Sequence, residues 1–177
     1  MDAKLYAKVL ALVPLLKPLS PDEVDEIMAI SKLLKVRKGV KVVEEGDEAE
    51  AMYILVEGSV QVTKMLPGGE STPLADLKAP TVFGEMALID RERRSASVVT
   101  LTDTVLFQVN LQAFNELRAR YRPAAFKMLR SIAPTLCGRL RGLNDRIGEF
   151  FKNPEANLAE LEQQFLNRQL SVPGKPR

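Results

Sequence analysis

Two short segments of the chain contain the residue types best suited to binding an anion. Residues 83–88 are Phe-Gly-Glu-Met-Ala-Leu, and residues 94–98 are Arg-Ser-Ala-Ser-Val. Gly84 precedes several helix-forming residues, and a tight turn there would direct backbone N–H groups toward one point, where an anion is attracted. Arg94 adds a planar guanidinium that pairs with two phosphate oxygens at once. These features predict a phosphate-binding site.

Glu85 does not fit a site for phosphate alone, because a carboxylate repels a phosphate. It fits if it accepts a hydrogen bond from a neutral group, such as a ribose hydroxyl. Ser95 adds a further hydroxyl, and Ala96 is small enough for a ligand to approach the backbone. A phosphate on one side and a ribose on the other describe a nucleotide. The alternative is that Glu85 and Arg94 form only a surface ion pair, worth about 0–1 kcal/mol.

The composition excludes several classes of function. The 177 residues include 25 Lys and Arg against 23 Asp and Glu, so the net charge of +2 is too balanced to indicate general nucleic-acid binding. No histidine is present, which excludes a histidine-based metal site, a histidine general base and a Ser-His-Asp triad. With a single cysteine, Cys137, no internal disulfide can form. The composition thus removes histidine-based metal sites and histidine-based catalysis from the candidate functions.

The segments that must position these residues differ in character along the chain. Residues 1–34 predict an N-terminal helical segment, in which Ser20, Pro21 and Glu23 form the start of a helix with a capping box. Residues 35–110 contain short segments rich in Val, Ile, Thr and Leu, separated by turn residues at intervals of about 8–12 residues. This pattern is typical of an antiparallel sandwich or barrel.

Residues 111–151 again have a helical pattern, and residues 152–177 form a tail with a short amphipathic helix. Apolar residues follow a 4-3-4-3 spacing at Leu136, Leu140, Leu143, Ile147 and Phe150. This seam predicts either a parallel dimer interface or a helix that packs back on its own barrel. We expect Pro134 to kink or interrupt the helix, and Cys137 to be a small buried residue.

The two candidate segments resemble the phosphate-binding cassette of the cyclic nucleotide-binding domain family, which includes the bacterial catabolite activator protein and the regulatory subunits of cAMP-dependent protein kinase. The matching positions are Phe83, Gly84, Glu85, Ala87, Leu88, Arg94, Ser95, Ala96 and Ser97, and Met86 is a conservative departure. Similarity extends from about residue 12 to residue 150, with glycines of successive turns in register. The resemblance implies a mainly β (α+β) fold, an eight-stranded antiparallel jelly-roll barrel with N-terminal helices and a C-terminal helical lid.

The resemblance also implies a role for each cassette residue. Arg94 should neutralise the cyclic phosphate, and Glu85 should accept a hydrogen bond from the ribose 2′-hydroxyl. Gly84, Glu85 and Ala96 should offer backbone N–H groups to the phosphate or ribose region. Ser95 should offer a hydroxyl or a backbone N–H there.

The remaining predicted contacts surround the base, and they too follow from the resemblance. Phe83 and Ala87 belong to the cassette. An apolar floor under the base should contain Val60, Val62, Met86 and Val98. The helix after the barrel should cap the base, with Arg139, Leu143 and Asn144 near the capping positions.

The function that the resemblance implies is a stand-alone cyclic nucleotide sensor that is not an enzyme and holds neither a metal nor a cofactor. It would reposition its C-terminal helices when the ligand binds, and a separate, unidentified effector protein would respond. The expected ligand is cAMP, with cGMP as the alternative, since Ser95 does not decide between them.

We expect no DNA binding, because 27 residues after Phe150 are too few for a three-helix DNA-binding unit. We also expect a cytoplasmic protein that does not bind a membrane, because no apolar run approaches the roughly 18 residues of a membrane span and no targeting segment is recognisable. Under one of the two interpretations of the helix seam, the protein forms a homodimer. Two alternatives to the sensor function are a non-binding structural or interaction module with a degenerate pocket, and a truncated activator-type transcription regulator.

Overall fold

The structure is a computed structural model that describes residues 12–66, 69–90, 92–152, 154–155 and 158. The chain divides into two compact units, Met1–Thr135 and Leu136–Arg177. The first unit contains every strand of the described residues, together with the cassette. The second begins inside the last long helix.

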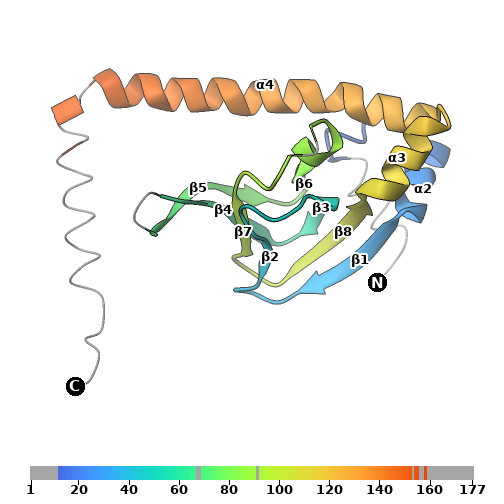
Figure 1. The fold of residues 1–177 in the computed structure, drawn as a ribbon, viewed down its shortest axis with the longest axis horizontal. Coiled ribbons are helices and arrows are strands. Elements are labelled where there is room, and N and C mark those ends of the chain that lie inside the picture. The colour runs from blue at the N-terminus through green and yellow to red at the C-terminus, as the bar shows by residue number, and fades with distance from the viewer. Residues whose placement is uncertain (1–11, 67–68, 91, 153, 156–157, 159–177) are drawn as a thin grey trace. The chain divides into compact units, whose positions relative to one another are not determined.

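Eight strands form two four-stranded antiparallel sheets (Figure 1). They are β1 (Ser31–Val36), β2 (Lys41–Val43), β3 (Ala51–Glu57), β4 (Ser59–Met65), β5 (Ser71–Lys78), β6 (Thr81–Phe83), β7 (Ser97–Thr100) and β8 (Thr104–Asn110). The strand order is β1-β8-β3-β6 in one sheet and β2-β7-β4-β5 in the other. The predicted eight-stranded antiparallel jelly roll with flanking helices is confirmed, as two sheets and not as one closed barrel. The sheet structure begins at Ser31, earlier than residue 35, because β1 starts directly after the helix α2 (Pro21–Ala29).

The main hydrophobic core lies between the sheets. It contains buried residues from six strands, namely Val43, Ala51, Tyr53, Leu55, Val60, Phe83, Val98 and Leu106. Successive side chains of a strand point to opposite faces, so Tyr53 and Leu55 face this core from β3, while Met52 and Ile54 point to the other side. Met52 and Ile54 are also completely buried. Both faces of β3 are therefore covered, which makes β3 a rigid support for the residues packed against it.

A sharp glycine turn joins β3 to β4. Gly58 has a φ of +88°, and a Cβ at this position would lie 2.5 Å from the carbonyl oxygen of Asp103. The turn is closed by a hydrogen bond from the backbone N–H of Ser59 to the hydroxyl of Thr102, 3.0 Å long. Only glycine meets both the backbone conformation and the space available there.

The first described helix, α2 (Pro21–Ala29), begins where the sequence predicts. The Ser20 hydroxyl accepts a hydrogen bond from the Glu23 backbone N–H at 3.4 Å, and the Glu23 carboxylate accepts one from the Ser20 N–H at 2.7 Å. This capping box is confirmed. Glu23 also pairs with Lys127 at 2.7 Å, so the start of α2 is bound to the last helix.

Two helices follow the sheets, α3 (Leu111–Ala119) and α4 (Pro123–Lys152). The expected interruption at Pro134 is wrong, because α4 continues through this residue to Lys152. A proline removes one backbone donor, a small part of the hydrogen bonding in a helix of 30 residues. The expected burial of Cys137 is also wrong, because the side chain is exposed.

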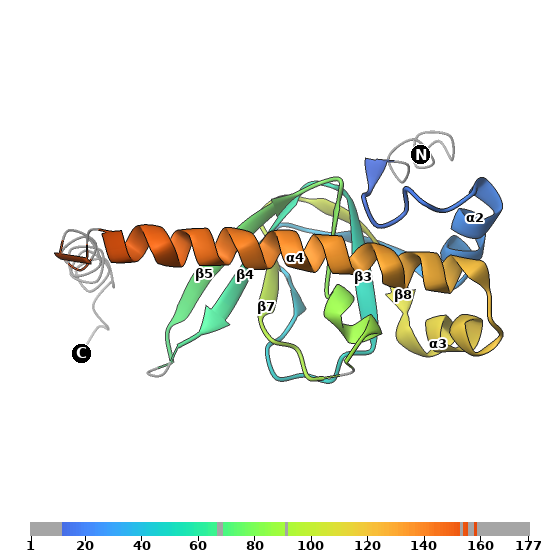
Figure 2. The same cartoon turned by 90° about the horizontal axis from the view of Figure 1, so that it is seen from above.

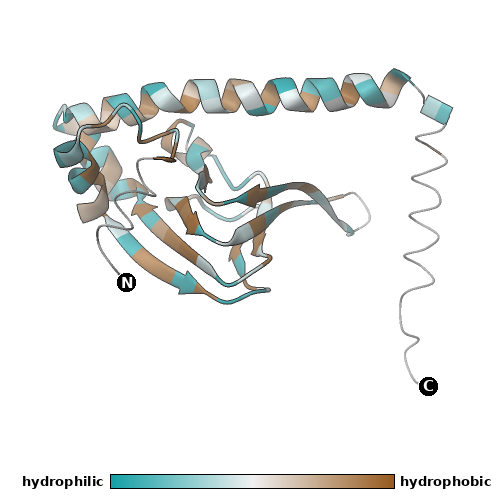
Figure 3. Ribbon diagram, turned by 180° about the vertical axis from the view of Figure 1, so that it is seen from behind, coloured by the Kyte–Doolittle hydropathy of each residue, from teal (hydrophilic) through white to brown (hydrophobic). Residues whose placement is uncertain are grey.

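The helices differ from the sheets in their hydropathy. Figure 3 shows hydrophobic residues concentrated on the strands, whereas hydrophobic and hydrophilic residues alternate along α4. Beyond Leu136, every described side chain of α4 is exposed. Among the described residues, no helix combines the length and the apolar character needed to cross a membrane.

Candidate functional site

The first part of the site is the turn between β6 and a short 3-10 helix, η1 (Glu85–Leu88). Figure 2 shows this helix, in light green, beside β3. Gly84 connects the two elements with a φ of +69°, in the left-handed region that side chains rarely adopt. A Cβ on Gly84 would lie 2.7 Å from Nη1 of Arg94. Glycine is therefore required both by the turn and by the close approach of the guanidinium.

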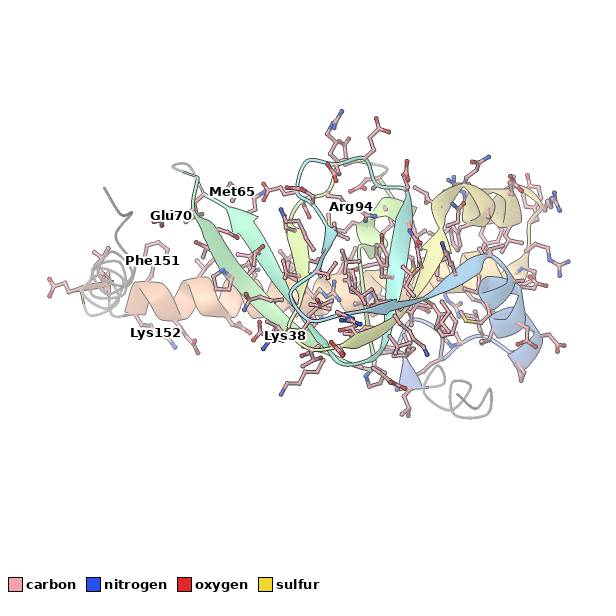
Figure 4. The ribbon with its side chains drawn as sticks, turned by 90° about the horizontal axis from the view of Figure 1, so that it is seen from below. Lys38, Met65, Glu70, Arg94, Phe151 and Lys152 are labelled. Carbon is pink, nitrogen blue, oxygen red and sulfur yellow. The ribbon has the colours of Figure 1, made fainter. Side chains whose placement is uncertain are left out.

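The Arg94 side chain lies between this turn and β3 (Figure 4). Its Nη2 donates a hydrogen bond of 2.5 Å to the carbonyl oxygen of Ala51, and its Nη1 donates one of 3.4 Å to the carbonyl oxygen of Gly84. The guanidinium carbon lies 5.9 Å from the ring centroid of Tyr53, within cation–π range. Tyr53 in turn stacks on Phe83, with the ring centroids 5.0 Å apart.

The electrostatic setting of Arg94 is unusual for an arginine. Desolvation by burial lowers the pKa of its half-buried guanidinium, whereas the nearby Tyr53, Asp47 and Glu50 raise it by smaller amounts. The group stays charged, because an arginine does not deprotonate in a protein. Within the described part of the chain, Arg94 forms no salt bridge with a carboxylate. Its positive charge is therefore available to an anion.

The loop between β2 and β3 positions the backbone of Arg94. The Arg94 N–H donates to the carbonyl oxygen of Asp47 at 2.9 Å, and the Arg94 carbonyl oxygen accepts from the Gly46 N–H at 2.9 Å. Nη1 of Arg93 also donates to the Gly46 carbonyl oxygen at 2.8 Å. The arginine of the site is therefore fixed to a turn that lies earlier in the sequence by about a third of the length of the first unit.

Glu85 is the buried first residue of η1, and it contrasts with the exposed Met86 in this helix and the exposed Ile89 just after it. Its side chain is only 1% exposed, whereas Met86 is 44% exposed and Ile89 is 53% exposed. No described salt bridge joins Glu85 to Arg94. A simple surface ion pair between them is therefore not what the structure shows, and the carboxylate belongs to the interior of the cassette.

The other predicted residues lie in three different places. Val60 and Val98 are in the core between the sheets, and the half-buried Val62 packs against it. Phe83 and Ala87 are buried in the cassette, and Ala96 is half-buried while Ser95 is exposed. Met86 lies on the exposed face of η1, outside the core cluster.

The three residues predicted to cap the base belong to the second unit. Arg139, Leu143 and Asn144 lie on α4, and their side chains are exposed. Glu85 and Arg94 belong to the first unit. The capping role of the three residues stays a prediction.

Sequence reasoning missed two groups that hold the site together. Tyr53 lies under the Arg94 guanidinium, and Lys64 hydrogen-bonds the carbonyl oxygen of Ser95 at 2.8 Å. Both residues are distant from the cassette in the sequence and are adjacent to it only through strand pairing.

The amino-acid sequence is similar to those of several known proteins. The sequence profile named "Cyclic nucleotide-binding domain" matches residues 33–121. The cyclic AMP receptor protein of Thermus thermophilus is 32% identical over 128 residues, which cover 72% of this chain and 57% of that protein. A cAMP-dependent protein kinase regulatory subunit of Aspergillus niger is 32% identical over 64% of this chain and 27% of that protein. Glutaminase 1 of Bradyrhizobium diazoefficiens is 37% identical over 78% of this chain, but over 22% of that protein. The chain thus matches less than two thirds of the length of each of these curated relatives.

Solved structures show the same likeness. A cyclic nucleotide-binding domain from Methylobacillus flagellatus superposes with a TM-score of 0.73 at 26% identity, covering 81% of this chain and 83% of that one. The catabolite activator protein of Thermus thermophilus superposes with a TM-score of 0.66 at 29% identity, covering 77% of this chain and 62% of that one.

Proposed function

The chain belongs to the cyclic nucleotide-binding domain family, and from this premise we propose that it binds cAMP, with cGMP as the alternative ligand, and that it catalyses no reaction. The observation that supports this most strongly is the environment of Arg94. Among the described residues, this half-buried guanidinium donates to the neutral carbonyl oxygens of Ala51 and Gly84, and it lies on an aromatic face. Such a group gains more from a bound anion than an exposed arginine does, because less water competes for it.

The cyclic phosphate is the group that we assign to Arg94. It carries one negative charge and two free oxygens, which suit the two outer nitrogens of a guanidinium. Backbone N–H groups of Gly84, Glu85 and Ala96, and the exposed Ser95, are the further donors in this proposal. They would neutralise the phosphate without a metal ion.

The ribose is the group that we assign to Glu85. A carboxylate accepts hydrogen bonds and donates none when ionised, so a neutral hydroxyl is a suitable partner beside a phosphate. The side chain is 1% exposed, so little water competes for its oxygens. The base would then lie against the apolar side chains near Val60, Val62 and Val98, with Met86 at the edge.

The output that we propose is a population shift. The ligand would favour the arrangement in which Arg139, Leu143 and Asn144 of α4 contact the base, and would shift the equilibrium only by its difference in affinity for the two arrangements. A separate effector protein in the cytoplasm would respond to the new position of the C-terminal helices. Lack of DNA binding is part of the same proposal.

A homodimer through α4 is a further part of the proposal. Leu140, Leu143 and Ile147 are 58%, 46% and 47% exposed and follow the spacing of a coiled-coil seam. The half-buried Leu136 continues this seam, and the side chain of Phe150 lies outside the described residues. Packing of the seam on the protein's own sheets is the alternative, and light scattering with and without nucleotide separates the two.

The decisive experiment is calorimetric titration of the purified, nucleotide-stripped protein. We expect heat and a raised Tm with cAMP or cGMP, and a much weaker response to 5′-AMP, whose phosphate is open and doubly charged. Absence of both heat and a Tm shift with either cyclic nucleotide at millimolar concentration would refute the proposed function. The ratio of the two affinities then identifies the preferred base.

A further inference from the structure

We propose that Glu45 and Lys64 are positioning residues for the nucleotide site, in an inference that rests on the proposed function. Their ion pair would hold residues 94–97, here called the cassette arm, against the turn at residues 45–47 before a ligand arrives. Neither residue belongs to the cassette motif, and neither is assigned a contact with the ligand.

The Lys64 ammonium connects the two segments directly. Lys64 lies on β4, and its Nζ donates to Oε1 of Glu45 at 2.6 Å and to the carbonyl oxygen of Ser95 at 2.8 Å. Ser95 directly follows Arg94 in the cassette arm. One charged group thus bridges the turn and the arm.

Glu45 completes the connection from the other side. Its Oε2 accepts a hydrogen bond of 2.9 Å from the backbone N–H of Met65, and its own N–H donates to the Ser97 hydroxyl at 3.0 Å. The hydrogen bond from Lys64 is the largest influence that lowers the pKa of the Glu45 carboxyl. Both carboxylate oxygens and the backbone of Glu45 therefore take part in holding the arm.

The backbones of the arm and the turn are hydrogen-bonded to each other at Arg94, the residue to which we assign the phosphate. Gly46 N–H donates to the Arg94 carbonyl oxygen, and Arg94 N–H donates to the Asp47 carbonyl oxygen, both at 2.9 Å. A shift of this pairing would move the Cα of Arg94 and hence its guanidinium. An arm that is held in place before binding avoids part of the ordering cost that binding otherwise includes.

The chain contains a matched ion pair without these contacts. Lys41 pairs with Glu44 at 2.8 Å, with side chains 46% and 57% exposed, three residues apart on and after β2. Lys64 is comparably open at 41%, whereas its partner Glu45 is 24% exposed, and this pair joins segments that are far apart in the sequence. Lys41 therefore serves as a control for the loss of one surface ammonium near the same loop.

The test compares Lys64→Met with Lys41→Met, since methionine keeps an apolar stem and removes the charge. In nucleotide-free protein, we expect the Gly46 and Arg94 amides to exchange with solvent about tenfold faster in Lys64→Met, because the hydrogen bonds that they donate to Arg94 and Asp47 open more often. The Lys41→Met protein should keep the rates of the unchanged protein. Tm should fall little in both variants, since each loses one surface pair.

The affinity for cAMP provides the second measurement. We expect a loss of about tenfold in Lys64→Met and none in Lys41→Met, because the ordering cost of the arm is then added to binding. Lys64→Arg should recover most of the affinity, since it keeps the charge and the donors. Normal exchange in Lys64→Met, or faster exchange with unchanged affinity, would overturn the positioning role.

The two proposals fail in different ways. If the unchanged protein binds no cyclic nucleotide, the proposed function is refuted, and the exchange rates of the nucleotide-free protein still decide whether Lys64 holds the arm. If the unchanged protein binds cAMP and the Lys64→Met protein matches it in both measurements, the positioning role alone is refuted.

Discussion

Arg94 and Arg122 have the same side chain, but the first unit holds them in opposite ways. Arg122 donates from Nε at 3.3 Å and from Nη2 to the carboxylate of Glu26, near the surface. Glu26 raises the pKa of Arg122, whereas burial lowers the pKa of Arg94. Arg94 donates to the carbonyl oxygens of Ala51 and Gly84, which are neutral.

The difference shows how a binding arginine is distinguished from a structural one. A carboxylate neutralises the charge of its arginine, so Arg122 offers little net positive charge to another anion. Carbonyl oxygens satisfy the donors of Arg94 but leave its net charge, and burial makes that charge costly until an anion arrives. The surroundings of the two guanidinium groups, and not their positions in a motif, therefore indicate which one binds phosphate.

The largest effect that we expect is on ligand affinity after Arg94→Ala. The loss of charge-assisted hydrogen bonds in a half-buried site should weaken cAMP binding by about 2 kcal/mol or more, roughly 30-fold. Arg122→Ala should bind cAMP as the unchanged protein does. Calorimetric titration of both variants checks the pair, and equal affinity in Arg94→Ala would mean that the phosphate binds elsewhere.

A smaller effect should follow when the turn beneath Arg94 is changed. In Gly84→Ala the new Cβ would meet Nη1 of Arg94 at 2.7 Å, in a backbone conformation with φ at +69°. We expect a stability loss of about 1–2 kcal/mol and a weaker affinity for cAMP, since the guanidinium must move aside.

Gly39 is the control for this change. It has a φ of +81°, but nothing lies within 4 Å of its added Cβ. In denaturant unfolding, Gly39→Ala should lose a similar amount of stability from backbone strain, and its affinity for cAMP should be unchanged. Affinity lost equally in both variants would show that backbone strain, and not the position of Arg94, controls binding.

In the nucleotide-free protein, replacing Arg122 should lower Tm more than replacing Arg94, which reverses the order expected for ligand affinity. Arg122→Met should lower Tm slightly, by an amount that shrinks at high salt, because it removes an exposed ion pair with Glu26. Arg94→Met should leave Tm unchanged or raise it, because a half-buried charge without a carboxylate partner is removed. Thermal unfolding at two salt concentrations measures both, and a larger Tm loss in Arg94→Met would contradict the comparison.

The smallest effect concerns acid stability. Lys127 is the largest influence that lowers the pKa of Glu23 below its ordinary value of 4.5. A carboxyl with a lowered pKa in the folded state stabilises the protein above pH 4.5, and this contribution is lost as the pH falls through the folded-state pKa. Denaturant unfolding between about pH 6 and about pH 3 should therefore show that Lys127→Met loses less stability as the pH falls than the unchanged protein does. An identical slope in both proteins would show that the pair does not contribute.

Features that depend on neighbouring residues could be predicted from the sequence. The capping box of Ser20 and Glu23 formed as predicted, because its partners are three residues apart. The alternating strands and their turns also predicted the fold class correctly. The interruption expected at Pro134 and the burial expected for Cys137 were wrong, because the continuity of a helix and the burial of a residue depend on what packs around them.

The sequence by itself determined the two segments of the cassette and the absence of histidine chemistry, since residue identity and local spacing are enough for both. It also determined where glycine permits a left-handed turn before Glu85. The tertiary structure decided which groups surround Arg94, because strand pairing brings Tyr53 and the turn at residues 45–47 to it from distant positions. Charge and burial at one atom depend on all the neighbours in space, and chain order alone does not specify them.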